Sequence, residues 1–222
     1  MQVIGHRGCA AEFPENTLAA IRGCAPHVDL IEIDVQRCRS GELVVFHDDT
    51  VDRLTDATGA VADFDYEELT TLTVGDSDQS IPTLGEVLDA LPEDTGVNVE
   101  LKRADVAGAV LDALADSDAE LIVSSFDPAA LAPFQGHSIP TAFLFAHSFE
   151  AGLQTALDLG CAFVHPRYAI TDAADIRRAH EHGMSVNAWT VPTEAGVRRL
   201  KAGGVDGVIV DTWRIIPGER TE

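Results

Sequence analysis

Lysine is nearly absent from this chain of 222 residues, which has only Lys102 and Lys201. Lysine and arginine together number 15 against 37 aspartates and glutamates, so the formal net charge is −22. Such a surface repels phosphate, which argues against nucleic acid as a partner and against stable association with an anionic membrane. Abundant carboxylate with little lysine is also typical of proteins from a salt-saturated cytoplasm, where salt screens the repulsion. We therefore hypothesise a halophilic source, with an acidic mesophilic protein as the alternative.

Long apolar runs are also missing. No segment approaches the roughly 20 apolar residues that a membrane-spanning helix needs. The first eight residues are too polar to begin a signal peptide and are typical of an early strand, so we expect a cytoplasmic protein. With 45% hydrophobic residues, the chain can still bury a sizeable core. We expect a single domain over residues 1–222.

Cysteine is scarce, and its spacing shows no close pair such as Cys-x-x-Cys. The four cysteines are Cys9, Cys24, Cys38 and Cys161. This spacing fits neither a zinc site nor the dense disulfide framework of small secreted domains. We expect all four to be reduced and partly buried.

Short apolar runs alternate with helical patterns along the chain, which is typical of a parallel α/β sheet. The pattern predicts strands at residues 3–6, 30–35, 43–47, 97–102, 121–125, 141–145, 162–165, 185–191 and 207–211. It predicts helices at residues 16–24, 83–91, 105–115, 128–134, 149–159, 172–182 and 194–202. Nine strands are one more than an eight-stranded barrel holds.

A hairpin resolves the extra strand. Residues 30–35 and 43–47 are separated by a short polar turn, whereas a parallel connection needs about a dozen residues. We therefore expect these two strands to be antiparallel, with the turn centred between Arg39 and Ser40, which would place Glu32 opposite His47. The other eight strands predict a TIM (β/α)8 barrel. Residues 49–80 interrupt the alternation and predict a small insertion after the hairpin.

Carboxylates gather where two of the barrel strands end, the edge at which TIM barrels place their catalytic residues. Glu32 and Asp34 lie two apart on one strand, so their side chains leave the same face. Glu100 ends the neighbouring strand and can supply a third oxygen. Three carboxylates without a cysteine pair suit a hard divalent cation, Mg²⁺ or Ca²⁺. The alternative is two solvated carboxylates and a salt bridge.

Basic side chains end strands around the same carboxylates. Arg7 and Lys102 form a positive pair suited to a phosphate group, although Lys102 could simply pair with the neighbouring glutamate. His6 and His47 also end strands; near pH 7 one histidine can accept a proton while the other donates one. His165 ends a later strand and could either line the pocket or support the core.

Short motifs follow one another along the chain in an ordered set. They are His6-Arg7-Gly8, Pro14-Glu15-Asn16-Thr17, Glu32-x-Asp34, His47-Asp48, Glu100-x-Lys102, Ser125-Phe126 and Trp189-Thr190-Val191. Over residues 3–213 this set resembles the glycerophosphodiester phosphodiesterase family, whose fold is a TIM barrel like that of phosphatidylinositol phospholipase C. The resemblance implies metal-dependent hydrolysis of a small glycerophosphodiester to glycerol phosphate and an alcohol.

The resemblance also implies a role for nine residues. By position, one divalent cation, Mg²⁺ or Ca²⁺, would be bound by Glu32, Asp34 and Glu100. The acid-base pair would be His6 and His47, and the phosphate oxygens would be held by Arg7 and Lys102. The glycerol carbons would pack against Trp189 and Phe126. Two alternatives stay open: a related phosphodiesterase for lysophospholipids or phosphoinositides, and a barrel that binds phosphodiesters without cleaving them. The sequence also leaves room for a homo-oligomer.

Overall fold

The computed structural model describes residues 1–218, and these form one closed barrel of parallel strands. The nine strands of this part of the chain are β1 (Gln2–Gly5), β2 (Leu30–Arg37), β3 (Leu43–Val45), β4 (Gly96–Leu101), β5 (Leu121–Ser125), β6 (Thr141–Phe145), β7 (Phe163–Pro166), β8 (Ser185–Ala188) and β9 (Gly207–Val210). β1 pairs with both β9 and β2, which closes eight strands into a ring, and β3 lies antiparallel on β2. The predicted TIM barrel and hairpin are confirmed.

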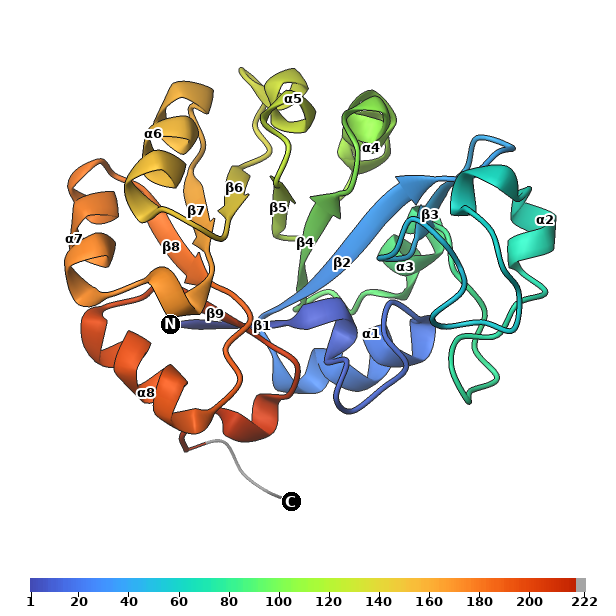
Figure 1. Ribbon diagram of the computed structural model, residues 1–222, viewed down its shortest axis with the longest axis horizontal. Coiled ribbons are helices and arrows are strands. Elements are labelled where there is room, and N and C mark those ends of the chain that lie inside the picture. The colour runs from blue at the N-terminus through green and yellow to red at the C-terminus, as the bar shows by residue number, and fades with distance from the viewer. Residues whose placement is uncertain (219–222) are drawn as a thin grey trace.

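Helices surround the strands on the outside of the ring (Figure 1). They are α1 (Leu18–Cys24), α2 (Tyr66–Leu69), α3 (Leu84–Ala90), α4 (Ala107–Leu114), α5 (Pro128–Leu131), α6 (Phe149–Leu159), α7 (Ala173–Glu181) and α8 (Glu194–Gly203). Polar side chains begin all of them except α4, which follows Val106. Thr83 and Glu86, for example, form a capping box on α3, and Asp127 accepts the Ala129 N–H at α5. Within residues 1–218, no helix combines the length and the apolar character needed to cross a membrane.

Two apolar cores hold the barrel together. The larger one lies between the strands and the helices, where β-branched residues of the strands pack against the helix faces. A smaller one fills the barrel interior with Ile4, Leu30, Ile122, Ala142 and Ile209. The insertion, which lies beside β3 at the right of Figure 1, has an apolar cluster of its own that includes the buried residues Phe46 and Leu69.

The register of the hairpin differs from the prediction. Val35 lies opposite Val45, so the turn is centred on Ser40 and the predicted pairing of His47 was one residue out of register. The cause is Gly41, whose φ of 106° lies in the left-handed region. A three-residue hairpin loop prefers glycine at that position. The ladder stops at Val45, which leaves His47 free to turn toward the barrel mouth.

The expectation of four reduced cysteines was wrong, because Cys9 and Cys24 form a disulfide in the structure. Cys38 and Cys161 are free and buried. Gly5 makes the pairing possible: a Cβ on this residue would lie 2.4 Å from the sulfur of Cys24 and 2.8 Å from that of Cys9. The disulfide joins the segment after His6-Arg7-Gly8 to the end of α1. Sequence spacing alone could not show this, because the approach depends on how α1 folds back against β1.

Candidate active site

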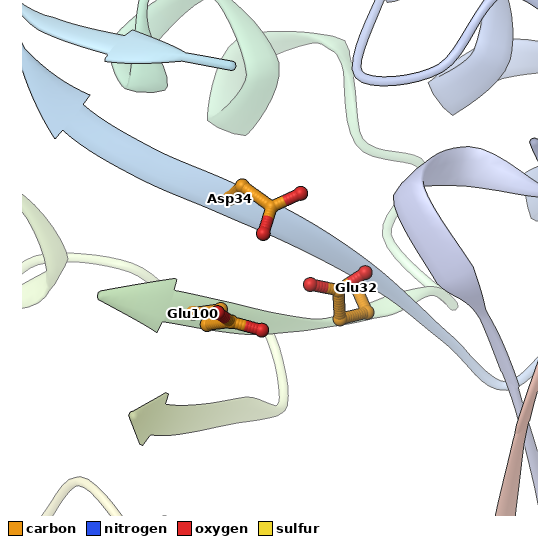
Figure 2. A group of neighbouring side chains, drawn as sticks. All are labelled: Glu32, Asp34 and Glu100. Atoms are coloured by element: carbon orange, nitrogen blue, oxygen red, sulfur yellow. The ribbon is translucent and has the colours of Figure 1, made fainter. Parts of the chain in front are cut away.

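Three carboxylates meet on the inner faces of two neighbouring parallel strands, β2 and β4. Glu32 and Asp34 come from one face of β2, and Glu100 comes from β4, directly opposite Asp34 in the parallel register (Figure 2). One oxygen of each lies within 4.8 Å of the others. The residues are only 2%, 1% and 9% exposed, respectively. The predicted spacing thus places three nearly water-free carboxylates around one point.

Burial and mutual repulsion keep these carboxylates from ionising together. Burial, reinforced by the charge of Asp34, raises the pKa of Glu32 to about 8. The same two causes raise the pKa of Glu100. Burial also opposes ionisation of Asp34, but the charges of Lys102 and Arg7 outweigh it and lower the pKa of that carboxyl. Full ionisation of all three groups therefore requires additional positive charge among them.

The two cations predicted to bind phosphate are anchored to this cluster. The Lys102 ammonium lies 2.7 Å from Glu100 Oε1 and 3.3 Å from Asp34 Oδ1. The Arg7 Nε lies 3.4 Å from Asp34 Oδ2, and the Arg7 backbone N–H donates to Glu32 Oε2 at 2.8 Å. The pairing of Lys102 with Glu100 is therefore present. Both side chains keep some exposure toward the barrel mouth, at 19% for Lys102 and 16% for Arg7.

His6 lies between an aspartate and the carboxylate cluster. Its Nδ1 is 2.7 Å from Asp211 Oδ1, and its Nε2 is 4.0 Å from Glu32 Oε2. Burial lowers the pKa of His6, but the hydrogen bond to Asp211 and the charge of Glu32 outweigh burial, so the pKa lies above its usual value. Asp211 thus fixes the ring, with Nε2 directed at the site.

His47 is oriented by a similar pair. Its Nδ1 lies 2.5 Å from Asp48 Oδ1, and Asp48 in turn accepts from Arg53 Nε at 2.6 Å. The hydrogen bond from Arg53 lowers the pKa of Asp48 to about 2, so this partner is a carboxylate. Nε2 is the ring nitrogen left for chemistry. Both histidines predicted as the acid-base pair line the same cavity. In each of them Nδ1 is hydrogen-bonded to an aspartate and Nε2 is not.

Asn16 and Glu15 are supporting residues that the motif analysis left without a role. The Asn16 amide donates to Asp34 Oδ2 at 2.9 Å, and Glu15 accepts from Arg7 at 2.9 Å. Asn16 is 2% exposed and has a φ of 59°, a left-handed conformation that asparagine tolerates better than most residues. Their position just after the His-Arg-Gly motif was the available signal.

A cavity of about 200 Å³ opens between the histidines and the carboxylates. It is lined by His6, Arg7, Glu32, His47, Asn98, Glu100, Phe126, Leu144, Trp189, Thr190 and Ile209. The two aromatic rings form one wall, with centroids 5.3 Å apart and an edge-to-face angle of 88°. The Trp189 indole donates to the carbonyl of His165 at 2.7 Å, which fixes its orientation. His165 itself is fully buried in the barrel interior and does not line the cavity.

Several known proteins similar to this chain in both sequence and structure are named glycerophosphodiester phosphodiesterases. The model of the glycerophosphoryl diester phosphodiesterase family matches residues 6–214. A glycerophosphodiester phosphodiesterase of Caldanaerobacter subterraneus is 32% identical over 94% of this chain and 93% of its own length. A phosphodiesterase of Oleispira antarctica, solved in complex with the product sn-glycerol-3-phosphate, superposes with a TM-score of 0.90 at 29% identity, covering 97% of this chain and 95% of its own.

A glycerophosphodiester phosphodiesterase of Thermotoga maritima is similar as well. It has a TM-score of 0.85 at 28% identity over 97% of this chain and 96% of its own. The resemblance found in the sequence motifs and the predicted enzyme class are confirmed. This chain belongs to the glycerophosphoryl diester phosphodiesterase family.

Proposed function

We propose that this protein hydrolyses glycerophosphodiesters to glycerol phosphate and an alcohol, with one divalent cation, Mg²⁺ or Ca²⁺. The observation that carries the proposal is the cavity itself. It is lined by two histidines, each hydrogen-bonded to an aspartate, and by two of the three clustered carboxylates. The basic side chains of Arg7 and Lys102 form ion pairs with that carboxylate cluster. The similar Oleispira phosphodiesterase holds sn-glycerol-3-phosphate, which supports a substrate of this size and chemistry.

The carboxylate cluster suits a hard divalent cation. Glu32 Oε1 is buried and has no hydrogen-bond partner, so one ligand atom is available without breaking an existing contact. Oxygen donors alone, with no sulfur or imidazole among them, match the preference of Mg²⁺ and Ca²⁺. The cation would be held by Glu32, Asp34 and Glu100. When bound, it would supply Lewis-acid stabilisation of phosphoryl charge and a template for the substrate.

The remaining polar groups divide the other tasks. Arg7 and Lys102 bind phosphoryl oxygens and so neutralise part of their negative charge. His6 and His47 form the acid-base pair: one removes the proton from the attacking hydroxyl or water, and the other protonates the departing alkoxide. Asp211 and Asp48 keep each imidazole oriented for this transfer, since each is hydrogen-bonded to an Nδ1 atom.

A water-soluble diester is favoured over a lipid substrate. The aromatic pair Trp189 and Phe126 offers a wall against which a short glycerol chain can pack. Among residues 1–218, the exposed large hydrophobic side chains are Met1 and Phe126, too few for a contiguous apolar surface that would dock on a bilayer. We therefore place lysophospholipids and phosphoinositides second. A binding protein without activity is disfavoured because both histidines and all three carboxylates are present.

The test is release of glycerol phosphate from glycerophosphoethanolamine and glycerophosphoglycerol in molar KCl. Reactions contain Mg²⁺, Ca²⁺ or EDTA, and lysophospholipid and phosphoinositide are assayed in parallel with a liposome-pelleting experiment. Turnover of the soluble diesters that EDTA abolishes is the expected result. Turnover of lipid alone, with protein in the liposome pellet, would favour the second candidate. If the folded protein turns over none of these substrates, the result would favour a barrel that binds phosphodiesters without cleaving them.

The surface charge suggests where the enzyme works. A net charge of −22 with two lysines is suited to a salt-rich cytoplasm, in which ions screen the repulsion among carboxylates. We therefore propose a halophilic, cytoplasmic enzyme. The dependence of its stability on KCl, described below, tests the halophilic part of this proposal.

A further inference from the structure

The parallel register sorts the inward-facing side chains of the barrel into stacked layers, each built from alternate strands. The layer at the mouth includes His6, Glu100 and Trp189. One layer deeper lie Glu32, Ser124, His165 and Ile209, and the next layer consists of Ile4, Asn98, Ala142 and Asn187. Barrel interiors are normally filled by branched apolar residues. Here two successive layers beneath the mouth are largely polar.

These two layers also hold most of the buried polar atoms that lack a partner. Seven side-chain atoms within residues 1–218 are buried without a hydrogen bond, and six of them lie here. They are Glu32 Oε1, Asn98 Nδ2 and Oδ1, Ser124 Oγ, His165 Nδ1 and Asn187 Oδ1. Buried polar groups are nearly always paired in folded proteins, so such a concentration calls for a ligand or a specific role.

Asn98 differs from the other uncharged polar residues of these two layers, which are Ser124, His165 and Asn187. It is 1% exposed, yet it lines the cavity between the histidines and the carboxylates, whereas Ser124, His165 and Asn187 do not. Both of its amide atoms are without a partner, so it presents one donor and one acceptor side by side. A hydroxyl group is itself both a donor and an acceptor, and is the group that matches such an amide best.

The depth of Asn98 fits one particular hydroxyl. It precedes Glu100 by two residues on β4, which places it roughly 6.6 Å deeper along the strand than the mouth layer. The cations that suit a phosphate lie at the mouth, and the cavity wall between mouth and floor is apolar, formed by Leu144, Trp189 and Ile209. A glycerol phosphate bound by its phosphate would extend its carbons along this wall, with its terminal hydroxyl at the floor.

We propose that Asn98 binds the terminal hydroxyl of the substrate's glycerol and thereby selects glycerol over shorter or deoxygenated alcohols. This inference rests on the proposed glycerophosphodiester activity. It adds a specificity-determining residue that takes no part in bond making or breaking. A hydroxyl-binding site rejects an analogue that lacks the hydroxyl, because the buried amide is then left unpaired.

The experiment compares two substrates on three variants. One substrate is glycerophosphoethanolamine, and the other is its analogue with a methyl group in place of the terminal CH2OH, which keeps the hydroxyl nearest the phosphate ester. Asn98→Leu keeps the volume and removes both polar atoms, and Asn98→Ala is the smaller second variant. Ser124→Ala is the matched control, since Ser124 is also buried and unpartnered but lies outside the cavity lining.

The wild-type protein is expected to prefer the glycerol substrate by about 10- to 100-fold in kcat/KM, as the cost of an unpaired buried amide implies. Both Asn98 variants should lose at least about tenfold on glycerol and less than about threefold on the analogue, so that the preference collapses, while Ser124→Ala keeps it. Thermal unfolding checks that each variant is folded. Equal losses on both substrates, or a wild type without preference, would overturn the proposal. A wild type that cleaves neither substrate would instead overturn the glycerophosphodiester activity on which it rests.

Discussion

Binding of a divalent cation should stabilise the folded protein measurably, because the proposed site is built from three buried carboxylates. In the unfolded chain these groups are scattered and hydrated, so the cation binds the native state far more tightly. At 100 times its dissociation constant, a ligand of the native state alone contributes about 2.7 kcal/mol to the free energy of unfolding. For a chain of this length, each kcal/mol raises the melting temperature by about 2–4 °C. Mg²⁺ or Ca²⁺ should therefore raise the melting temperature by roughly 5–11 °C.

Differential scanning calorimetry at constant KCl, with EDTA as the reference state, measures this shift. Glu100→Gln removes the negative charge of one proposed ligand while keeping the size of the side chain. It should abolish most of the cation-induced rise in melting temperature. Glu93→Gln is the matched control, since it removes a carboxylate from an exposed position and should leave the shift intact. A wild type that melts at the same temperature with either cation and with EDTA would refute the metal site. An undiminished shift in Glu100→Gln would refute the assignment of this residue as a ligand.

Three further outcomes follow from the structure. His6→Ala and His47→Ala should each lower kcat at least about 100-fold with an unchanged circular dichroism spectrum, and near-full activity of either variant would remove that histidine from the acid-base pair. Burial lowers the pKa of His165 to about 3, below the unfolded value near 6.5. The unfolded state therefore gains a proton first as pH falls, and wild-type stability should drop by up to about 1.4 kcal/mol per pH unit below pH 6.5. Urea unfolding of His165→Asn between pH 7 and 4 should show a shallower fall; parallel curves would show that His165 is not the cause. Finally, the melting temperature should rise from dilute buffer to molar KCl, and equal stability in both would contradict the halophilic hypothesis.

The carboxylate cluster could be predicted because its geometry is local. Glu32 and Asp34 share a face by the two-residue period of a strand, and a parallel neighbour necessarily brings its own C-terminal end, with Glu100, to the same edge. Lys102 follows from the same periodicity. These placements depend on strand direction and spacing alone, and both can be seen in the pattern of apolar residues.

Other parts of the site depend on how distant segments close on each other. Asp211 contacts His6, 205 residues away in the sequence, because β9 pairs with β1. The residues around either side chain do not predict this contact. The disulfide between Cys9 and Cys24 likewise depends on the fold of α1. Asn98 stands in the apolar run of β4, where sequence reasoning treats a single polar residue as unimportant. Its role becomes visible only when the barrel interior is assembled.

The measurement that bears most directly on the proposed activity follows glycerophosphoethanolamine by phosphorus NMR, with wild-type protein and the Glu100→Gln variant side by side in molar KCl and Mg²⁺. The wild type should convert the diester signal into that of glycerol phosphate, and no phosphoethanolamine should form. The variant should leave the diester nearly intact. Equal conversion by both proteins, or release of phosphoethanolamine, would contradict the proposed chemistry of the carboxylate cluster.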